Sequence, residues 1–420
     1  MVKNAIVVSL SKDILEIKDL TETLGYEIIN DFIQNKNKPD PNSYIGPGKV
    51  NEIKDYIEKN DVKIDLLVIN GKLKPSQWFF LEKKIGTEVF DRIRLILKIF
   101  EKHAESREAR LQVKLAQLEY ERSFVRELIH RARSGEHPGF MAGGEYQVDD
   151  YYEMIKKQTK KLKSDLEKIR NERNIRRQHR HKGGFFLVSL AGYTNAGKSS
   201  LLNILSDEKV KVEGKLFSTL STTTRRIIHN NIPVLLTDTV GFIKDLPAII
   251  IDAFHSTLEE IEVADVVLLV LDISEELEIV EEKFKVSINE LSEIGVDSNI
   301  IIVCNKIDKI NLETLEYRIK FLKNLETKDT LKFIGISIKS KKNIDKLMDI
   351  IYSCLPGIIR YKICLPFNEE VQSIISWIYE KANVVDVKYD KSVELTVESD
   401  SSIKEKILSK SKKYDIKILE

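Results

Sequence analysis

The chain has 420 residues, of which 42% are hydrophobic and 32% charged, so it is long enough for several domains and too apolar to be disordered throughout. Its 67 basic and 66 acidic side chains leave a net charge of +1, which means that any surface for a polyanion must be local. The three cysteines form neither a CxxC pair nor a zinc-ligand pattern and fit a reducing cytoplasm. The most apolar stretch, 264–273, carries two aspartates and is far shorter than the roughly twenty residues of a spanning helix, so we expect a cytoplasmic chain without membrane contact.

The first hundred residues alternate short β-rich runs, at 5–10, 64–70 and 93–97, with helical patterns. This alternation predicts a small α/β domain over residues 1–102. Its midpoint is rich in proline and glycine, so we expect residues 44–49 to form an exposed turn before a helix.

Residues 103–182 show helical spacing of apolar residues on both sides of a glycine-bearing stretch at 135–144. We therefore predict two long helices that fold back as an antiparallel hairpin. Residues 151–182 contain 12 Lys/Arg and 4 Asp/Glu, a local charge of +8. A solvated helix face is one interpretation of this charge, and a surface for RNA phosphates is the other.

The remainder of the chain divides into two further regions. Residues 183–356 alternate strands and helices, which predicts a doubly wound parallel sheet. Residues 357–420 follow the order strand, helix, strand, strand, helix, strand, which is that of a ferredoxin-like domain. The predicted fold class is thus multidomain α/β, with regions 1–102, 103–182, 183–356 and 357–420.

A glycine-rich motif lies between an apolar strand and a helical run, the context of a phosphate-binding loop. Its glycines let backbone N–H groups face the α- and β-phosphates, and the following helix N-terminus adds positive potential. Lys198 would reach the β- and γ-phosphate oxygens, and Ser199 would offer its hydroxyl to Mg²⁺. The motif is Gly192-Tyr193-Thr194-Asn195-Ala196-Gly197-Lys198-Ser199.

Two later motifs complete the signature of a guanine-nucleotide domain. In the first, Asp238 would hold the water shell of the metal and the N–H of Gly241 would meet the γ-phosphate. In the second, Asp308 can accept hydrogen bonds from guanine N1–H and the 2-amino group, which adenine lacks, so GTP is favoured over ATP. The motifs are Asp238-Thr239-Val240-Gly241 and Asn305-Lys306-Ile307-Asp308.

Other groups should frame the base. Asn305 would bond the base's other polar edge and brace the phosphate loop, while the stem of Lys306 would lie along the purine. A further segment, Ser337-Ile338-Lys339, would present backbone N–H to the guanine carbonyl.

The Thr- and Ser-rich segment 217–226 is predicted to be the switch that covers the metal. Thr219 and the threonines at 222–224 could each supply a hydroxyl to Mg²⁺, and spacing does not choose among them. Phe242 stands where Ras-like enzymes have a glutamine that orients the attacking water, and a phenyl ring cannot do so. We therefore expect slow intrinsic hydrolysis that depends on an outside partner; the alternative is that Phe242 packs in the core and another group positions the water.

Taken together, these motifs resemble the HflX-type GTPases, and the resemblance extends over nearly the whole chain. In the family's pattern Thr219 is the metal ligand, beside Ser199 and Asp238. Pro47 stands where the family usually has a basic residue, and residues 141–147 only loosely match the family's hairpin tip. The segments that carry the resemblance outside the nucleotide motifs are Tyr44-Ile45-Gly46-Pro47-Gly48-Lys49-Val50, Pro75-Ser76-Gln77, Val89-Phe90-Asp91-Arg92 and Leu111-Gln112-Val113-Lys114-Leu115-Ala116-Gln117-Leu118, together with the switch segment Phe217-Ser218-Thr219-Leu220-Ser221.

The resemblance implies a monomeric, Mg²⁺-dependent GTPase that associates with the large ribosomal subunit and its RNA and separates stalled or idle ribosomes. Two alternatives stay open. The first is a non-ribosomal signalling switch whose hairpin binds a protein, for which partner binding would be insensitive to salt. The second is a nucleotide-gated scaffold with negligible turnover, which single-turnover hydrolysis would exclude.

Overall fold

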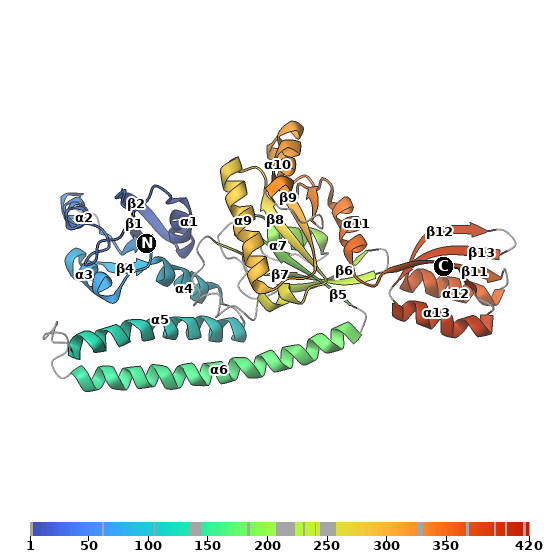
Figure 1. The fold of residues 1–420 in the computed structure, drawn as a ribbon, viewed down its shortest axis with the longest axis horizontal. Coiled ribbons are helices and arrows are strands. Elements are labelled where there is room, and N and C mark those ends of the chain that lie inside the picture. Colours follow the sequence, from blue (N-terminus) through green and yellow to red (C-terminus); the bar gives the residue numbers. More distant parts are fainter. Residues whose placement is uncertain are drawn as a thin grey trace. The chain divides into compact units, whose positions relative to one another are not determined.

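The computed structural model describes residues 3–60, 63–104, 106–133, 144–182, 185–206, 223–229, 232–239, 241–243, 258–325, 331–366, 369–389, 392–399, 401–414 and 417–419 (Figure 1). They fall into two compact units: the described part of the first ends at Asn171, and that of the second begins at Glu172. Among these residues, no helix combines the length and the apolar character needed to cross a membrane.

The first unit begins with a parallel four-stranded sheet of order β2-β1-β3-β4. The central strands β1 and β3 are buried over most of their length because helices cover them. The elements are β1 (Lys3–Ser9), α1 (Leu15–Leu24), β2 (Tyr26–Ile33), α2 (Pro47–Asn60), β3 (Leu66–Ile69), α3 (Pro75–Ile85), β4 (Glu88–Asp91) and α4 (Arg92–His103). The α/β character agrees with the prediction from sequence, although β2 was not predicted.

Two local predictions for this region are wrong. Residues 93–97, expected as a strand, belong to α4, whose first turn is capped by Asp91 through a 2.8 Å hydrogen bond from the backbone N–H of Arg94. Residues 44–49 do not form an exposed turn as a whole, because Tyr44 and Ile45 are 6% and 0% exposed and only Pro47 and Gly48, at the start of α2, are exposed. The Tyr44 hydroxyl donates to the carbonyl oxygen of Asn70 at 3.0 Å, which ties this segment to the end of β3.

Two long helices, α5 (Arg107–Arg133) and α6 (Gly144–Lys182), complete the first unit as far as Asn171. They pack side by side through a buried cluster of Leu118, Val125 and Ile155. An ion pair of 2.8 Å between Lys163 and Glu119 adds a polar link. Residues 134–143, which include the start of the expected tip, lie outside the described residues.

The second unit contains a six-stranded sheet of order β10-β9-β8-β5-β7-β6, parallel except that β6 runs antiparallel to β7. Strands β8 and β9 are buried along most of their length because helices cover both faces. This is the predicted doubly wound sheet, to which the structure adds the edge strand β6. The elements are β5 (Phe186–Ala191), α7 (Lys198–Leu205), β6 (Thr223–His229), β7 (Ile232–Asp238), β8 (Val266–Asp272), α9 (Leu277–Ile294), β9 (Asn299–Asn305), α10 (Leu312–Leu325), β10 (Lys332–Gly335) and α11 (Ile344–Cys354).

The C-terminal part of the second unit has an antiparallel sheet of order β12-β13-β11-β14. Alternate residues of β11 and β13 are buried, so one face of the sheet forms a core with the helices. The elements are β11 (Ile359–Pro366), α12 (Glu369–Lys381), β12 (Asn383–Tyr389), β13 (Ser392–Ser399), α13 (Ser401–Tyr414) and β14 (Lys417–Leu419).

Candidate functional site

The motifs singled out in the sequence meet at one edge of the six-stranded sheet. Residues 192–197 connect β5 to α7, Asp238 ends β7, Asn305 ends β9, and Ser337 follows β10. The carboxyl ends of parallel strands are where open α/β sheets bind ligands. The structure therefore brings the predicted loops together although they span more than a hundred residues of sequence.

Two glycines give the phosphate loop its shape. Gly192 and Gly197 have φ of +129° and +108°, which L side chains rarely adopt. A Cβ on Gly192 would lie 2.3 Å from the carbonyl oxygen of Val270, and a Cβ on Gly197 would lie 2.5 Å from Nδ2 of Asn305. Both positions thus combine a left-handed backbone with a close neighbour, and only glycine satisfies both.

Lys198 is 7% exposed and lies inside this loop. Its Nζ donates to the carbonyl oxygens of Gly192 and Tyr193 at 2.9 and 2.8 Å. Burial lowers the pKa of Lys198 to about 8, and the attraction of Asp238 opposes this shift. A Cβ on Gly241 would lie 2.8 Å from the same Nζ, so the backbone of the second motif lies directly against the ammonium.

The chemistry of one oxygen pair suits a magnesium ion. Ser199 Oγ donates to Oδ2 of Asp238 at 2.6 Å, so the two predicted metal-site oxygens are already together. Hydroxyl and carboxylate oxygens are ligands that Mg²⁺ accepts. Thr239 Oγ1 donates to the carbonyl oxygen of Leu190 at 2.6 Å and fixes the end of β7.

Only the end of the predicted switch, residues 223–226, lies among the described residues. Phe217, Ser218, Thr219, Leu220 and Ser221 lie outside the described residues, as do Thr222 and Val240. Thr223 and Thr224 belong to β6, and Thr224 Oγ1 lies 3.0 Å from Thr237 Oγ1.

The base-recognition groups form one hydrogen-bonded cluster. Asp308 Oδ1 accepts a 2.6 Å bond from Ser337 Oγ, and this bond holds the pKa of the Asp308 carboxyl below its usual range, with Lys339 adding attraction. Asn305 Nδ2 donates to the carbonyl oxygen of Ala196 at 2.9 Å, and its Oδ1 accepts from the N–H of Ile338 at 3.3 Å. Asn305 therefore braces the phosphate loop and links it to the segment after β10, and Asp308 remains an ionised acceptor.

Three family models match consecutive parts of the chain. They are described as GTP-binding GTPase N-terminal (residues 11–101), GTP-binding GTPase Middle Region (103–180) and 50S ribosome-binding GTPase (187–306). The chain is 38% identical to the GTPase HflX of Thermococcus kodakarensis over 90% of its own length and 87% of that protein. The chain belongs to the HflX family of GTPases. The GTPase HflX of Methanocaldococcus jannaschii is 40% identical over 89% of this chain and 90% of its own.

As an HflX-family member, the chain is a GTPase with a phosphate-loop domain. A solved structure, that of SsGBP in complex with GDP, is 30% identical and aligns with a TM-score of 0.50 over 84% of this chain and 98% of its own.

Sequence reasoning missed one residue of this HflX-family site. Asp272, at the end of β8, forms a 2.5 Å ion pair with Nζ of Lys306, which also donates to the carbonyl oxygen of Asn195 at 3.2 Å. Burial by itself would raise the pKa of the Asp272 carboxyl. Hydrogen bonds from Lys306 and Ser274 outweigh this effect, so the pKa lies below its usual range. A carboxylate that directly ends an apolar strand at this edge is the signal that could have identified it.

Phe242 of this GTPase is 4% exposed and belongs to the core. Its N–H donates to the carbonyl oxygen of Gly192, and its carbonyl oxygen accepts from the N–H of Thr194, both at 3.0 Å. The residue after Gly241 thus supports the phosphate loop instead of facing a water molecule, which is the packing expected if another group positions the water.

Proposed function

We propose that the chain is a Mg²⁺-dependent GTPase switch that associates with the large ribosomal subunit and its RNA. The observation that carries this proposal is the match of residues 187–306 to the 50S ribosome-binding GTPase family, within a chain that belongs to the HflX family. Separation of stalled or idle ribosomes is the finer role that the family resemblance suggests.

The nucleotide site divides its work among few groups. Asp308 and Asn305 bind the guanine edge, Lys306 covers the purine face, and Lys198 leaves its two carbonyl partners for the β- and γ-phosphates. Ser199, Asp238 and Thr219 would hold Mg²⁺, which neutralises phosphate charge when bound. Because the phenyl ring of Phe242 cannot orient the attacking water, another group must do so, and we infer that a partner supplies it.

We further propose that residues 1–102 and the hairpin 103–182 contact the RNA. Lys157, Lys160 and Lys161 are exposed on α6, and none of them has an ion-pair partner within the part of the chain that the structure describes. Such lysines can exchange counterions for phosphates, so the binding they support weakens with salt. The GTPase domain at 183–356 and a ferredoxin-like domain at 357–420 complete the proposed organisation; the antiparallel order β12-β13-β11-β14 supports the latter.

The test measures GTP turnover with and without purified large ribosomal subunits over a salt series, together with co-sedimentation. We expect strong stimulation and salt-sensitive co-migration. Replacing Lys157, Lys160 and Lys161 by Gln should lower the slope of log Kd against log salt by up to about three. A matched control replaces Lys362, Lys388 and Lys406, which are exposed in the C-terminal region, and should leave the slope unchanged.

The outcomes separate the alternatives. Turnover that is the same with and without subunits, and no co-migration, would overturn the ribosomal role. Stimulation by a ribosome-free protein fraction through salt-insensitive binding would instead support a signalling switch with a protein partner.

A further inference from the structure

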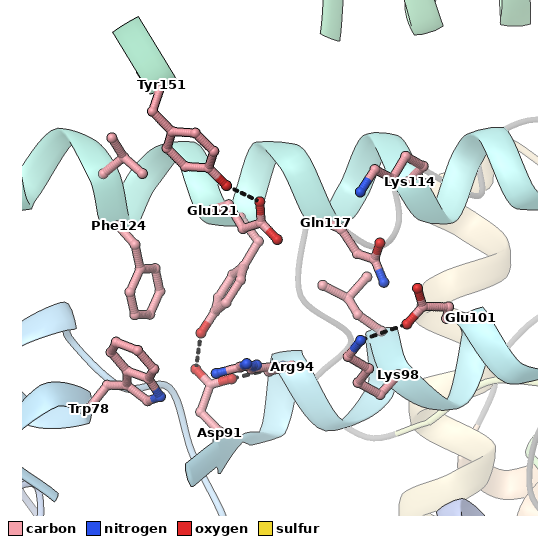
Figure 2. A pocket seen from close by; sticks show the side chains of 13 residues that line it. Trp78, Asp91, Arg94, Lys98, Glu101, Lys114, Gln117, Glu121, Phe124 and Tyr151 are labelled. Carbon is pink, nitrogen blue, oxygen red and sulfur yellow. Dashed lines mark hydrogen bonds and ion pairs between the residues drawn. The ribbon is translucent and has the colours of Figure 1, made fainter. Parts of the chain in front are cut away.

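A pocket of about 330 Å³ lies in the first unit, outside the nucleotide site (Figure 2). Its walls come from α4 and α5, while Trp78 of α3 and Tyr151 of α6 contribute to one end. This volume is within the range of small-ligand sites.

One end of the pocket is aromatic. The rings of Trp78 and Phe124 meet edge to face with centroids 6.2 Å apart, and Tyr120 lies 4.7 Å from Phe124. The guanidinium of Arg94 lies 5.6 Å over the Trp78 ring, and Tyr151 is 41% exposed at the rim. Such a set of rings beside a planar cation is typical of surfaces on which flat, unpaired bases stack.

Three carboxylates of the pocket already have partners, and one lysine of the pocket has no close partner among the described residues. Asp91 accepts from the Tyr120 hydroxyl at 2.8 Å, and Glu121 accepts from the Tyr151 hydroxyl at 3.3 Å (Figure 2). Glu101 pairs with Lys98 at 2.8 Å. Lys114 lines the pocket, is exposed, and has no hydrogen bond or ion pair within the described ranges. Each carboxylate thus has a partner, and Lys114, which attracts Glu101 without forming an ion pair with it, can meet an anionic group.

We propose that this pocket binds one unpaired nucleotide of an RNA strand, with its base on the aromatic end and its phosphate near Lys114. An RNA is favoured over a protein because the rings and a lysine without an ion pair in the described ranges line the same pocket. The inference deepens the proposed RNA contact and rests on it for its biological partner.

The chain provides its own reporter, because its two tryptophans are Trp78 and Trp377. In the full-length Trp377→Phe variant, saturated with GDP, we expect an eight-nucleotide oligouridine to quench Trp78 fluorescence. The same oligomer with abasic sites, a twelve-base-pair RNA duplex and inorganic polyphosphate should quench it far less. Base stacking on an aromatic ring contributes about 1–3 kcal/mol, so Tyr151→Ala should weaken binding about tenfold.

Matched variants show what the ring does. Tyr151→Phe keeps the ring and loses only the bond to Glu121, so binding should be retained. Tyr389→Ala removes a 65% exposed ring in the C-terminal region and should have no effect. Lys114→Gln, at an exposed position, should weaken binding and lower its salt dependence.

Several results would overturn the inference. If polyphosphate or the abasic oligomer quenches as strongly as oligouridine, the site recognises charge alone. If free UMP binds as tightly as oligouridine, the pocket is a small-molecule site. Absence of quenching while large subunits still stimulate GTP turnover would reject the pocket and keep the ribosomal role. Quenching by oligouridine without any binding of large subunits would keep the pocket and reject that role.

Discussion

The nucleotide site and the pocket of the first unit are built in opposite ways. The nucleotide site gathers short loops at the ends of parallel strands, so each of its motifs is contiguous in sequence. The pocket lies between the sides of helices, and its lining residues, from Trp78 to Tyr151, are scattered over some seventy positions. A sheet edge places whole loops in one position, whereas a groove between helices takes single residues from each turn.

This difference predicts how each region responds to substitution. In the nucleotide site, one residue often serves both backbone geometry and ligand binding, so a single change should weaken binding strongly without unfolding the domain. In the pocket, the rings and the buried Asp91 also hold helices together, so changes there should affect stability as well.

The largest effect is expected for Asp308→Asn. The amide can still accept the Ser337 hydroxyl, but it cannot accept two bonds from guanine, each of which contributes about 1.5–3 kcal/mol because the acceptor is charged. GDP affinity should fall at least a hundredfold, by about 3 kcal/mol or more, while XDP, whose C2 carbonyl can accept from the amide, should bind better than GDP. Fluorescent-nucleotide titrations with both ligands measure this. Unchanged GDP affinity would remove Asp308 from the site.

A smaller loss is expected for Gly197→Ala. The new Cβ would lie 2.5 Å from Asn305 Nδ2 in a left-handed backbone, so the phosphate loop and the base loop must separate. We expect GDP affinity to fall by about tenfold to a hundredfold, given strain of about 1–3 kcal/mol. Gly48→Ala is the control, because nothing lies within 4 Å of its added Cβ. If both variants bind GDP like the parent, the loop is less constrained than its geometry indicates.

Most of the nucleotide site could be predicted from the sequence. The pattern of apolar strands followed by short polar motifs predicted the doubly wound sheet and placed Lys198, Asp238 and Asn305 at one edge. The role of Asp272 was not predicted, because its partner Lys306 is distant in sequence and a lone aspartate after a strand has many interpretations. Strand β6 was not predicted, because its threonines also fit a mobile switch.

The first unit was harder to predict for a physical reason. The apolar run 93–97 is compatible with a strand or a buried helix, and only the cap from Asp91 and the long continuation of α4 decide it. Tyr44 and Ile45 follow prolines that indicate a surface turn, yet long-range contacts bury them. The pocket itself depends on how α4, α5 and α6 pack, which no local pattern encodes.

On the pocket side, Tyr120→Phe should destabilise the first unit. It removes one of the two hydrogen bonds to Asp91 Oδ2, a carboxylate that is 1% exposed, and leaves the 3.1 Å bond from the N–H of Leu73. The loss of one such hydrogen bond costs about 0.5–1.5 kcal/mol. Urea unfolding followed by Trp78 fluorescence in the Trp377→Phe background should show this loss, and GDP affinity should be unchanged. Tyr389→Phe, at an exposed position, provides the control. A loss of GDP affinity would show that the two regions are coupled.

The smallest expected effect is the uptake of a proton by the nucleotide site when GDP binds. The pKa of Lys198 is lowered to about 8 from its ordinary value of 10.5, so the nucleotide-free state releases this proton before the unfolded chain does. The free energy of unfolding should therefore rise with pH between about 8 and 10.5 through this group, whereas GDP affinity should fall by up to about tenfold per pH unit above 8. Because bound phosphates restore the charge, GDP binding at pH 8 should take up about half a proton.

Calorimetry in two buffers with different ionisation enthalpies measures this uptake. In the Lys198→Arg variant the guanidinium stays charged at pH 8, so GDP binding should not be accompanied by proton uptake. Equal uptake in both proteins would assign the proton to another group and place the charged Lys198 ammonium in the loop before any nucleotide arrives. Lys198 would then resemble Asp91, a buried polar group whose hydrogen bonds stabilise the fold. The nucleotide site and the pocket would in that case differ less in how their residues combine structure and binding.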